Sequence, residues 1–312
     1  MELILNLLTL QEKQREDFLR AAKGYEQIFA PVGVLEDGRP IPPELYRRAA
    51  VILGNPPVKE LAVCENLRLL QTRSAGTDQY QKPGVLPEGV TLLNASGAYG
   101  HSVSEHMFAM LLCLMKRLPA YRDRQRDGIW SDLGPVKTLA GALVLCVGTG
   151  DLGSSFARLC KALGARTAGI RRNVGKPAGG IDEMHPMDRL DKLLPQADVV
   201  ALMLPHSADT AHLMDRRRLL LMKQDAILLN GGRGTAVDCA ALAEVLEDGH
   251  LWGACLDVTD PEPLPAGHPL WAQERAVLTP HTAGGDHLAD TADRIAAIAL
   301  EHLAAFLKEE PH

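Results

Sequence analysis

The sequence has no hydrophobic run long enough to cross a membrane. A membrane helix needs roughly 18 consecutive apolar residues, and no stretch reaches that length. The first ten residues, MELILNLLTL, are apolar, but Glu2 stands where a secretion signal carries basic residues, and no small-residue cleavage site follows. We therefore predict a first β-strand here, and neither a signal peptide nor a membrane partner.

Basic runs and paired cysteine motifs are also missing. The net charge of −6 and the pI near 6.0 argue against nucleic acid or an anionic membrane as a partner. Because several cysteines lie in apolar runs, we expect reduced, buried thiols in a cytoplasmic protein, and no metal site. No Cys-x-x-Cys pattern occurs among the six cysteines, which are Cys64, Cys113, Cys146, Cys160, Cys239 and Cys255.

The composition is that of an ordinary globular protein, and one stretch has a distinctive pattern of apolar runs and glycines. The 312 residues are 46% apolar and 23% charged, which allows two domains and a substantial core. Residues 142–172 read ALVLCVGTGDLGSSFARLCKALGARTAGIRR. An apolar run precedes GTGDLG, a segment with helical apolar spacing follows it, and a second apolar run ends in two arginines. This order predicts a strand, a glycine turn, a helix and a second strand.

The glycine turn predicts a dinucleotide site. Gly148 allows the tight turn, Gly150 lets the backbone approach a pyrophosphate, and Gly153 lets the helix pack closely on the strand. A helix that begins near Asp151 directs its free N–H groups at the phosphates. The alternative is an accidental glycine turn, which the flanking elements disfavour. The cofactor contacts predicted in the turn are Gly148, Thr149, Gly150, Asp151, Leu152 and Gly153.

Arg171 and Arg172 at the end of the second strand favour NADP over NAD. NAD sites place an acidic residue here to accept hydrogen bonds from the ribose, whereas an NADP site must neutralise a 2′-phosphate. Arginine cannot accept a hydrogen bond, and its guanidinium group suits phosphate. A pair of solvated surface arginines is the alternative interpretation.

The segments on either side alternate strands and helices. Residues 1–94 predict a small α/β domain, in which the loops 54–57 and 74–77 follow strands. Ser102 and Glu105 have the spacing of a capping box before the apolar run MFAMLLCLM. Farther on, Asp238 is expected to cap a helix that Gly249 ends. The segment 286–310 predicts a last helix that returns to the first domain.

Three later predicted strands are each followed by an isolated polar residue that could take part in catalysis. Arg233 follows AILLNGG, Glu262 follows CLDVTDP and His281 follows AVLTP. Strand ends on one edge of a doubly wound sheet converge beside the nucleotide, so we expect these residues to form a site. The alternatives are a histidine that caps a strand end, a solvated glutamate and an arginine paired with some acid.

Seven motifs follow one another along the chain. They are RSAGTDQY, NASGAYGHSVSEH, GTGDLG, LPHSADT, NGGRG, LDVTDPEPLP and LTPHTAGG. In these motifs and their order the chain resembles the D-isomer-specific 2-hydroxyacid dehydrogenases, and within them the NADP-preferring glyoxylate/hydroxypyruvate reductase-like members. The resemblance covers nearly the whole chain.

The resemblance implies a role for each of the three polar residues. Arg233 would bind the carboxylate and carbonyl of a 2-oxo acid, which suits its planar guanidinium group. His281 would be the acid/base, because histidine exchanges protons near neutrality. Glu262 would support His281, since a neighbouring carboxylate favours the imidazolium.

By the same resemblance, further residues hold the substrate and the cofactor. The backbone amides of Ala75, Gly76 and Thr77 would hold the substrate carboxylate. The cofactor contacts outside the glycine turn would be Val103, Arg171, Arg172, Pro205, His206, Thr210, Asp257 and Gly284. Thr259 and Gly232 depart from common family forms, and we expect them to affect the shape of the pocket. Asn55 and Trp130 are expected to influence substrate size, although simple packing would also explain them.

The resulting prediction is a two-domain α/β enzyme with its active site in the cleft between the domains. Residues 95–285 would form a Rossmann domain with a doubly wound parallel sheet, and residues 1–94 with 286–312 a smaller flavodoxin-like substrate domain. The expected reaction is hydride transfer from NADPH to a small 2-oxo acid of the glyoxylate or hydroxypyruvate type, with NAD as a second possible cofactor and a homodimer as the assembly. The alternative is a dinucleotide-binding regulator or corepressor with the same fold. Formate oxidation is disfavoured, because that branch carries Gln at the position of Glu262.

Overall fold

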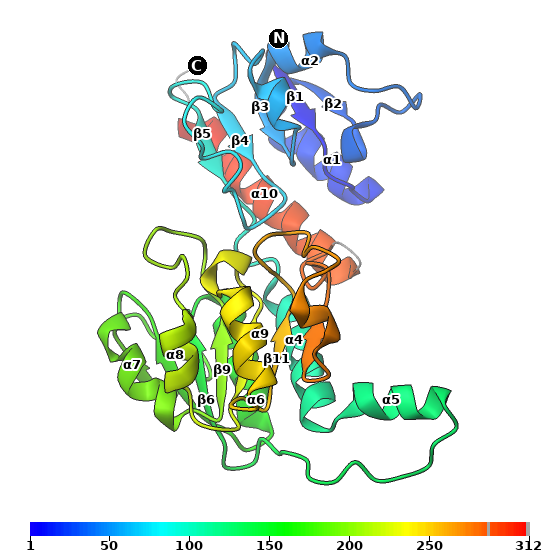
Figure 1. Cartoon of the computed structure of the whole chain (residues 1–312). Coiled ribbons are helices and arrows are strands. Elements are labelled where there is room, and N and C mark those ends of the chain that lie inside the picture. Colours follow the sequence, from blue (N-terminus) through cyan, green and yellow to red (C-terminus); the bar gives the residue numbers. More distant parts are fainter. Residues whose placement is uncertain (286–287, 310–312) are drawn as a thin grey trace. The chain divides into compact units, whose positions relative to one another are not determined.

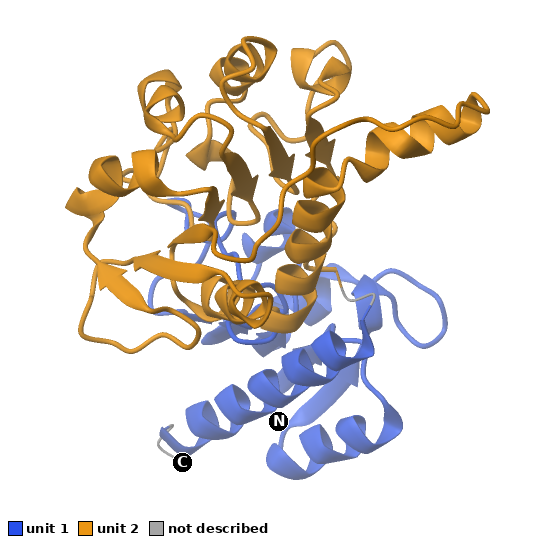
Figure 2. Cartoon of the chain, turned by 90° about the horizontal axis from the view of Figure 1, so that it is seen from below, with its two compact units in different colours: residues 1–98, 286–312 blue, residues 99–285 orange. Residues whose placement is uncertain are grey.

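The chain divides into two compact units, each with its own parallel sheet (Figure 2). The computed structural model describes residues 1–285 and 288–309. Unit 1 consists of Met1–Ala98 and Asp286–His312, and unit 2 of Tyr99–Gly285. The sequence had placed this boundary between residues 94 and 95, and the roles of substrate domain and cofactor domain stay predictions.

Unit 1 is built on a five-stranded parallel sheet in the order β2-β1-β3-β4-β5. The order reverses between β1 and β3, as in flavodoxin-like sheets. The strands are β1 (Leu3–Asn6), β2 (Glu26–Phe29), β3 (Ala49–Leu53), β4 (Leu69–Gln71) and β5 (Thr91–Leu93). The α-helices are α1 (Glu12–Ala21), α2 (Pro43–Arg48), α3 (Val58–Leu61) and α10 (Ala289–Glu309). The predicted flavodoxin-like α/β fold is therefore confirmed for this unit.

The central strands of unit 1 are continuous apolar runs because helices cover both faces of the sheet. Every residue of LILN in β1 and of AAVIL in β3 is buried. The predicted first strand is thus confirmed. The last helix, α10, packs against α1 and β4, and His302 Nδ1 lies 2.6 Å from Gln71 Oε1. The expected return of the last helix to the first domain is confirmed.

Unit 2 is built on a seven-stranded parallel sheet in the order β12-β11-β10-β9-β6-β7-β8. The chain runs outward from β6 to β8, then returns to place β9 on the other side of β6. This reversal is the point where doubly wound sheets bind ligands. The strands are β6 (Leu143–Val147), β7 (Arg166–Ile170), β8 (Glu183–His185), β9 (Val199–Leu202), β10 (Ile227–Asn230), β11 (Gly253–Leu256) and β12 (Ala276–Leu278). The predicted Rossmann arrangement is confirmed.

The helices of unit 2 form two layers because the two halves of the sheet are wound in opposite directions. Right-handed crossovers then place the helices of each half on opposite faces. α4 packs along α6, and α8 packs along α9; in Figure 1, α8 and α9 lie in front of the strands and α4 lies behind them. The α-helices are α4 (Gly100–Met115), α5 (Leu118–Arg126), α6 (Asp151–Ala162), α7 (Leu190–Leu193), α8 (Arg216–Leu221) and α9 (Cys239–Glu247).

Local signals predicted some helix ends correctly and one wrongly. Asp238 accepts a hydrogen bond from the Ala241 N–H and caps α9, and Gly249 follows the helix with φ of +73°. The capping box at Ser102 is wrong, because α4 already begins at Gly100 with Tyr99 as its N-cap. Ser102 Oγ instead donates to the Ala283 carbonyl at 2.6 Å. A tertiary hydrogen bond has taken the side chain that the local pattern assigned to the helix end.

The helix α5 extends away from the sheet of unit 2 and buries none of its residues (Figures 1 and 2). The segment around it exposes large apolar side chains. Leu118 and Ile129 are each half exposed, and Trp130 is fully exposed. Exposed apolar groups of this kind suit contact with another molecule. The homodimer expected from the sequence stays a prediction, as does the influence of Trp130 on substrate size.

Candidate active site

The glycine turn lies at the reversal point of the unit 2 sheet. β6 ends at Val147, and α6 begins at Asp151 with Gly150 as its N-cap. Gly148 has φ of +94°, and a Cβ there would lie 2.5 Å from the Met203 carbonyl oxygen, so only glycine fits. A Cβ on Gly153 would lie 2.0 Å from the Gly148 carbonyl oxygen. These two glycines are required by backbone packing.

Gly150 differs from the other two glycines, because a Cβ there would meet nothing within 4 Å. Its backbone faces open space at the start of α6, where free N–H groups and the positive end of the helix dipole attract anions. Thr149 is buried, and Leu152 is half-buried. The geometry at Gly150 therefore fits a bound pyrophosphate.

The two arginines follow β7 and have different surroundings. Arg171 Nη1 donates to the Lys176 carbonyl at 3.0 Å, which ties the side chain to its own loop. Arg172 is exposed. The loop reads RRNVGK over residues 171–176 and contains no acidic residue that could accept hydrogen bonds from a ribose. The preference for NADP over NAD stays a prediction.

The loop after β9 carries three further predicted cofactor contacts, Pro205, His206 and Thr210. Thr210 Oγ1 donates to the Pro205 carbonyl at 3.0 Å, and His206 Nδ1 lies 3.0 Å from Thr235 Oγ1. β9 pairs with β6, so this loop and the glycine turn follow neighbouring strands. The structure thus brings these residues to the same edge of the sheet as the glycine turn.

The three candidate catalytic residues follow β10, β11 and β12 at that same edge. Arg233 lies after β10, and its Nη1 donates to the Gly232 carbonyl at 2.9 Å. His281 Nδ1 lies 2.6 Å from Glu262 Oε1, and both side chains are roughly half exposed. An ionised carboxylate can only accept, so Nδ1 carries a hydrogen and donates it to Glu262. His281 Nε2 is then the nitrogen that can exchange a proton with a substrate.

His281 has an unusual backbone conformation, with φ of +51°. Side chains other than glycine seldom adopt this region, and it costs on the order of 1 kcal/mol or more. The N–H of His281 donates to the Asp257 carbonyl at 2.7 Å. The Asp257 carboxylate accepts from the backbone N–H groups of Thr282 and Ala283 at 3.0 and 3.1 Å. The conformation is therefore maintained from the end of β11.

Asp257 belongs to a buried network that the sequence did not predict. Its side chain is 3% exposed, and Thr279 Oγ1 donates to it at 2.6 Å. The single hydroxyl hydrogen of Thr279 is thereby used, so the hydroxyl accepts from His106 Nε2, which lies 3.0 Å away. The position of Thr279, two residues before His281, is the one signal in the sequence that could have identified the network.

The remaining predicted cofactor contacts lie beside the His281 loop. A Cβ on Gly284 would lie 3.5 Å from Val103 Cγ2, so Gly284 and the buried Val103 are neighbours. The Asp257 carboxylate is committed to the loop amides and to Thr279. Its contact with a cofactor stays a prediction.

The predicted substrate loop lies in unit 1, after β4. Ser74 Oγ donates to the Gly76 carbonyl at 2.7 Å, and Thr77 Oγ1 accepts from Gln81 Nε2 at 2.8 Å. Asn55, in the loop after β3, donates from Nδ2 to Ser74 Oγ at 3.1 Å. The loops 54–57 and 74–77 therefore contact each other. Asn55 supports this loop; its influence on substrate size, like the binding role of Ala75, Gly76 and Thr77, stays a prediction.

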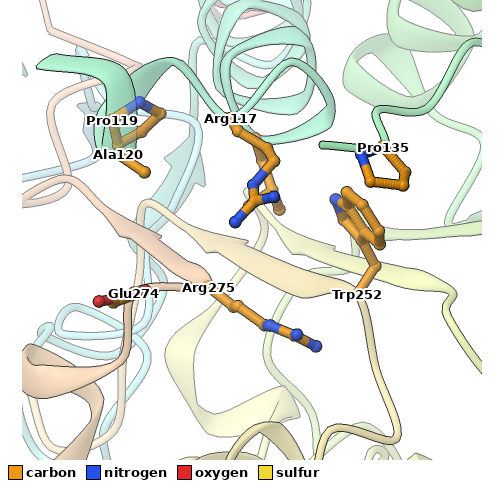
Figure 3. A pocket seen from close by; sticks show the side chains of 8 residues that line it. Arg117, Pro119, Ala120, Pro135, Trp252, Glu274 and Arg275 are labelled. Atoms are coloured by element: carbon orange, nitrogen blue, oxygen red, sulfur yellow. The ribbon is translucent and has the colours of Figure 1, made fainter. Parts of the chain in front are cut away.

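A separate hollow lies at the opposite edge of the unit 2 sheet. It has a volume of about 300 Å³, and Figure 3 shows Arg117 and Arg275 beside it, with Trp252 next to Pro135. Trp252 immediately precedes β11, and Arg275 immediately precedes β12. Parallel sheets of this kind bind ligands at the carboxyl ends of their strands. This hollow is therefore distinct from the group around His281.

Comparison with known proteins identifies relatives for most of the chain. Residues 108–283 match the family model described as "D-isomer specific 2-hydroxyacid dehydrogenase, NAD binding domain". A glyoxylate reductase of Korarchaeum cryptofilum is 32% identical over 252 residues, which cover 78% of this chain and 74% of that protein.

Solved structures are similar over both units. A D-isomer specific 2-hydroxyacid dehydrogenase family protein from Aeromonas salmonicida has a TM-score of 0.83 and 31% identity, and the match covers 99% of this chain and 97% of that one. A D-isomer specific 2-hydroxyacid dehydrogenase from Xanthobacter autotrophicus, in complex with NADPH and MES, has a TM-score of 0.79 and 28% identity, with 99% and 96% covered.

Proposed function

The chain belongs to the family of D-isomer-specific 2-hydroxyacid dehydrogenases, and from this membership we propose that it reduces a small 2-oxo acid to the D-2-hydroxy acid with NADPH. The family makes it a nicotinamide-dependent oxidoreductase that acts on small 2-oxo and 2-hydroxy acids. The preference for NADPH and the activity on substrates of the glyoxylate or hydroxypyruvate type are the proposal.

Residues of unit 2 would hold the cofactor. The amides from Gly148 to Gly153 would bind the pyrophosphate, and Arg171 with Arg172 the 2′-phosphate. When bound, the nicotinamide supplies the hydride for the carbonyl carbon. The absence of an acidic residue in the loop 171–176 supports NADPH, as does the NADPH complex of the Xanthobacter protein.

The chain's own residues would bind the substrate and move the proton. Arg233 would pair with the carboxylate of the 2-oxo acid through its planar guanidinium group. His281 Nε2 would donate a proton to the carbonyl oxygen as the carbon is reduced. Glu262 would hold Nδ1 and stabilise the charged imidazole. The observation that carries this mechanism is the 2.6 Å contact between His281 Nδ1 and Glu262 Oε1, which leaves Nε2 free.

A steady-state assay of cofactor oxidation tests the proposal. Purified protein would be mixed with NADPH or NADH and one of glyoxylate, hydroxypyruvate or pyruvate, with acid-free mixtures as the control. We expect oxidation of NADPH that depends on the acid, with kcat/KM at least tenfold higher for NADPH than for NADH. Equal use of the two cofactors would contradict the NADPH preference alone.

The same assay separates the enzyme from the regulator that shares this fold. Tight binding of NADPH or NADH without oxidation in the presence of any 2-oxo acid would contradict the proposed activity and favour the regulator.

The homodimer and the cytoplasmic location stay predictions. Among residues 1–285 and 288–309, no helix is long and apolar enough to span a membrane.

A further inference from the structure

We propose that a pocket beside His281, here called the Thr259 pocket, receives the apolar side chain of a 2-oxo acid larger than glyoxylate. The pocket has a volume of about 470 Å³ and is lined by both His281 and Glu262. Small-molecule sites in proteins have volumes of about 300 to 1,000 Å³. This inference rests on the proposed function and specifies the substrate class of the same site.

The wall of the pocket is formed mainly by apolar side chains. Some of them lie in the segment between β11 and β12, and the others lie in β12 or just after it. The members are Pro263, Leu264, Trp271, Leu278 and Pro280. β12 is the edge strand of the sheet, and Trp271 keeps 56% of its surface exposed. The pocket is therefore accessible to a ligand from outside.

Three polar side chains in the wall already use their donor hydrogens within the protein. Thr259 Oγ1 donates to the Pro261 carbonyl at 3.0 Å, and Trp271 Nε1 donates to the Pro265 carbonyl at 2.9 Å. Thr279 Oγ1 donates to Asp257. A ligand acceptor group placed against these side chains would lose its hydrogen bonds to water without a matching gain. The pocket therefore favours an apolar group.

His281 connects this pocket to the reaction. Its Nδ1 is held by Glu262, and its Nε2 would face the carbonyl oxygen of the substrate. A 2-oxo acid bound in that way carries its side chain next to the carbonyl carbon. In glyoxylate this position holds only hydrogen, and in hydroxypyruvate a single polar carbon. Neither group would cover the apolar wall. A branched or aromatic side chain would contact it and remove apolar surface from water.

The first test uses the unmodified protein and a series of unbranched 2-oxo acids. We expect kcat/KM with NADPH to rise from pyruvate through 2-oxobutyrate to 2-oxohexanoate, because each added methylene contacts the apolar wall. A flat or falling series in a protein that reduces glyoxylate would overturn the inference and leave the proposed function intact. A failure to reduce any acid would instead contradict the proposed function, and this inference with it.

The second test fills the pocket with Thr259→Phe. We expect the ratio of kcat/KM for phenylpyruvate to that for glyoxylate to fall about tenfold or more, because the new ring occupies the space of the substrate's side chain. Thr259→Val is the matched control: it keeps the volume and removes only the hydrogen bond to Pro261, so the ratio should stay within about twofold. An unchanged ratio in a folded Thr259→Phe protein would overturn the inference.

Discussion

The imidazole of His281 is oriented by contacts from both its side chain and its backbone. Glu262 accepts from Nδ1, and the Asp257 carbonyl accepts from the backbone N–H. The left-handed conformation at His281 would be unfavourable in an isolated loop, so the bonds to Asp257 must stabilise it. A residue that costs conformational energy and whose loop is held by a buried aspartate is typical of a functional position.

Arg171 and Arg172 are the residues on which the cofactor preference depends. We expect Arg171→Asp and Arg172→Asp each to raise the KM for NADPH about tenfold or more, because a charge-assisted hydrogen bond contributes about 1.5–3 kcal/mol and an acidic side chain would repel the 2′-phosphate. The KM for NADH should change much less. Steady-state kinetics with both cofactors measures this.

Arg166→Asp provides the control for these two substitutions. It makes the same change of charge at the exposed opposite end of β7 and should leave the ratio of the two KM values within about twofold. If all three substitutions shifted the ratio alike, a general loss of positive charge would explain the effect, and Arg171 and Arg172 would not be the determinants.

The sequence could predict single residues of the site but not the hydrogen-bond network that supports them. Arg233, Glu262 and His281 could be found because each is an isolated polar residue after an apolar strand. The contacts among Asp257, Thr279 and His106 could not, because they join segments far apart in the chain. The catalytic and binding roles of the predicted residues stay predictions.

The βαβ unit from β6 to β7 was the most predictable element. The apolar periods and three glycines were sufficient to place the start of α6 at Asp151. The start of α4 was predicted wrongly, because the capping pattern at Ser102 is local and the bond from Ser102 to Ala283 is not. Local chemistry therefore predicts an element well where no distant group competes for the same side chain.

Two glycines of this unit should respond differently to the same added methyl group. Gly150→Ala should leave the free energy of unfolding within about 0.5 kcal/mol, because nothing lies within 4 Å of the new Cβ. Its dinucleotide affinity should nevertheless fall about tenfold, since the methyl group would keep the pyrophosphate from the backbone. Urea unfolding and fluorescence titration with NADPH measure the two quantities.

Gly153→Ala is the matched comparison. Its Cβ would lie 2.0 Å from the Gly148 carbonyl oxygen, so we expect a loss of about 1–3 kcal/mol or more in unfolding free energy. If Gly150→Ala bound NADPH as tightly as the unmodified protein, the proposed approach of the pyrophosphate to Gly150 would be wrong.

The alternation of apolar runs with helical segments, together with the resemblance, predicted two parallel sheets in the whole molecule. Both strand orders confirm the α/β fold. Composition also favoured buried thiols, and Cys64, Cys146, Cys160, Cys239 and Cys255 are buried. Burial raises the pKa of Cys146 to about 12 and that of Cys64 to about 11, so these thiols are unreactive near neutrality. The sequence carries no comparable signal for a partner of the exposed helix α5, because one chain does not specify the surface of another protein.

We propose that this molecule reduces a 2-oxo acid with His281 as the proton donor. The most direct measurement is kcat for glyoxylate at saturating NADPH in His281→Ala, beside the NADPH affinity of the same variant. We expect kcat to fall about 10²- to 10⁴-fold, because general acid catalysis contributes that much, while the affinity stays within about twofold. The control His268→Ala removes a histidine that caps the short helix Pro269–Ala272 and should retain most of kcat. A His281→Ala protein that reduced glyoxylate as fast as the unmodified protein would contradict the role of His281 as proton donor.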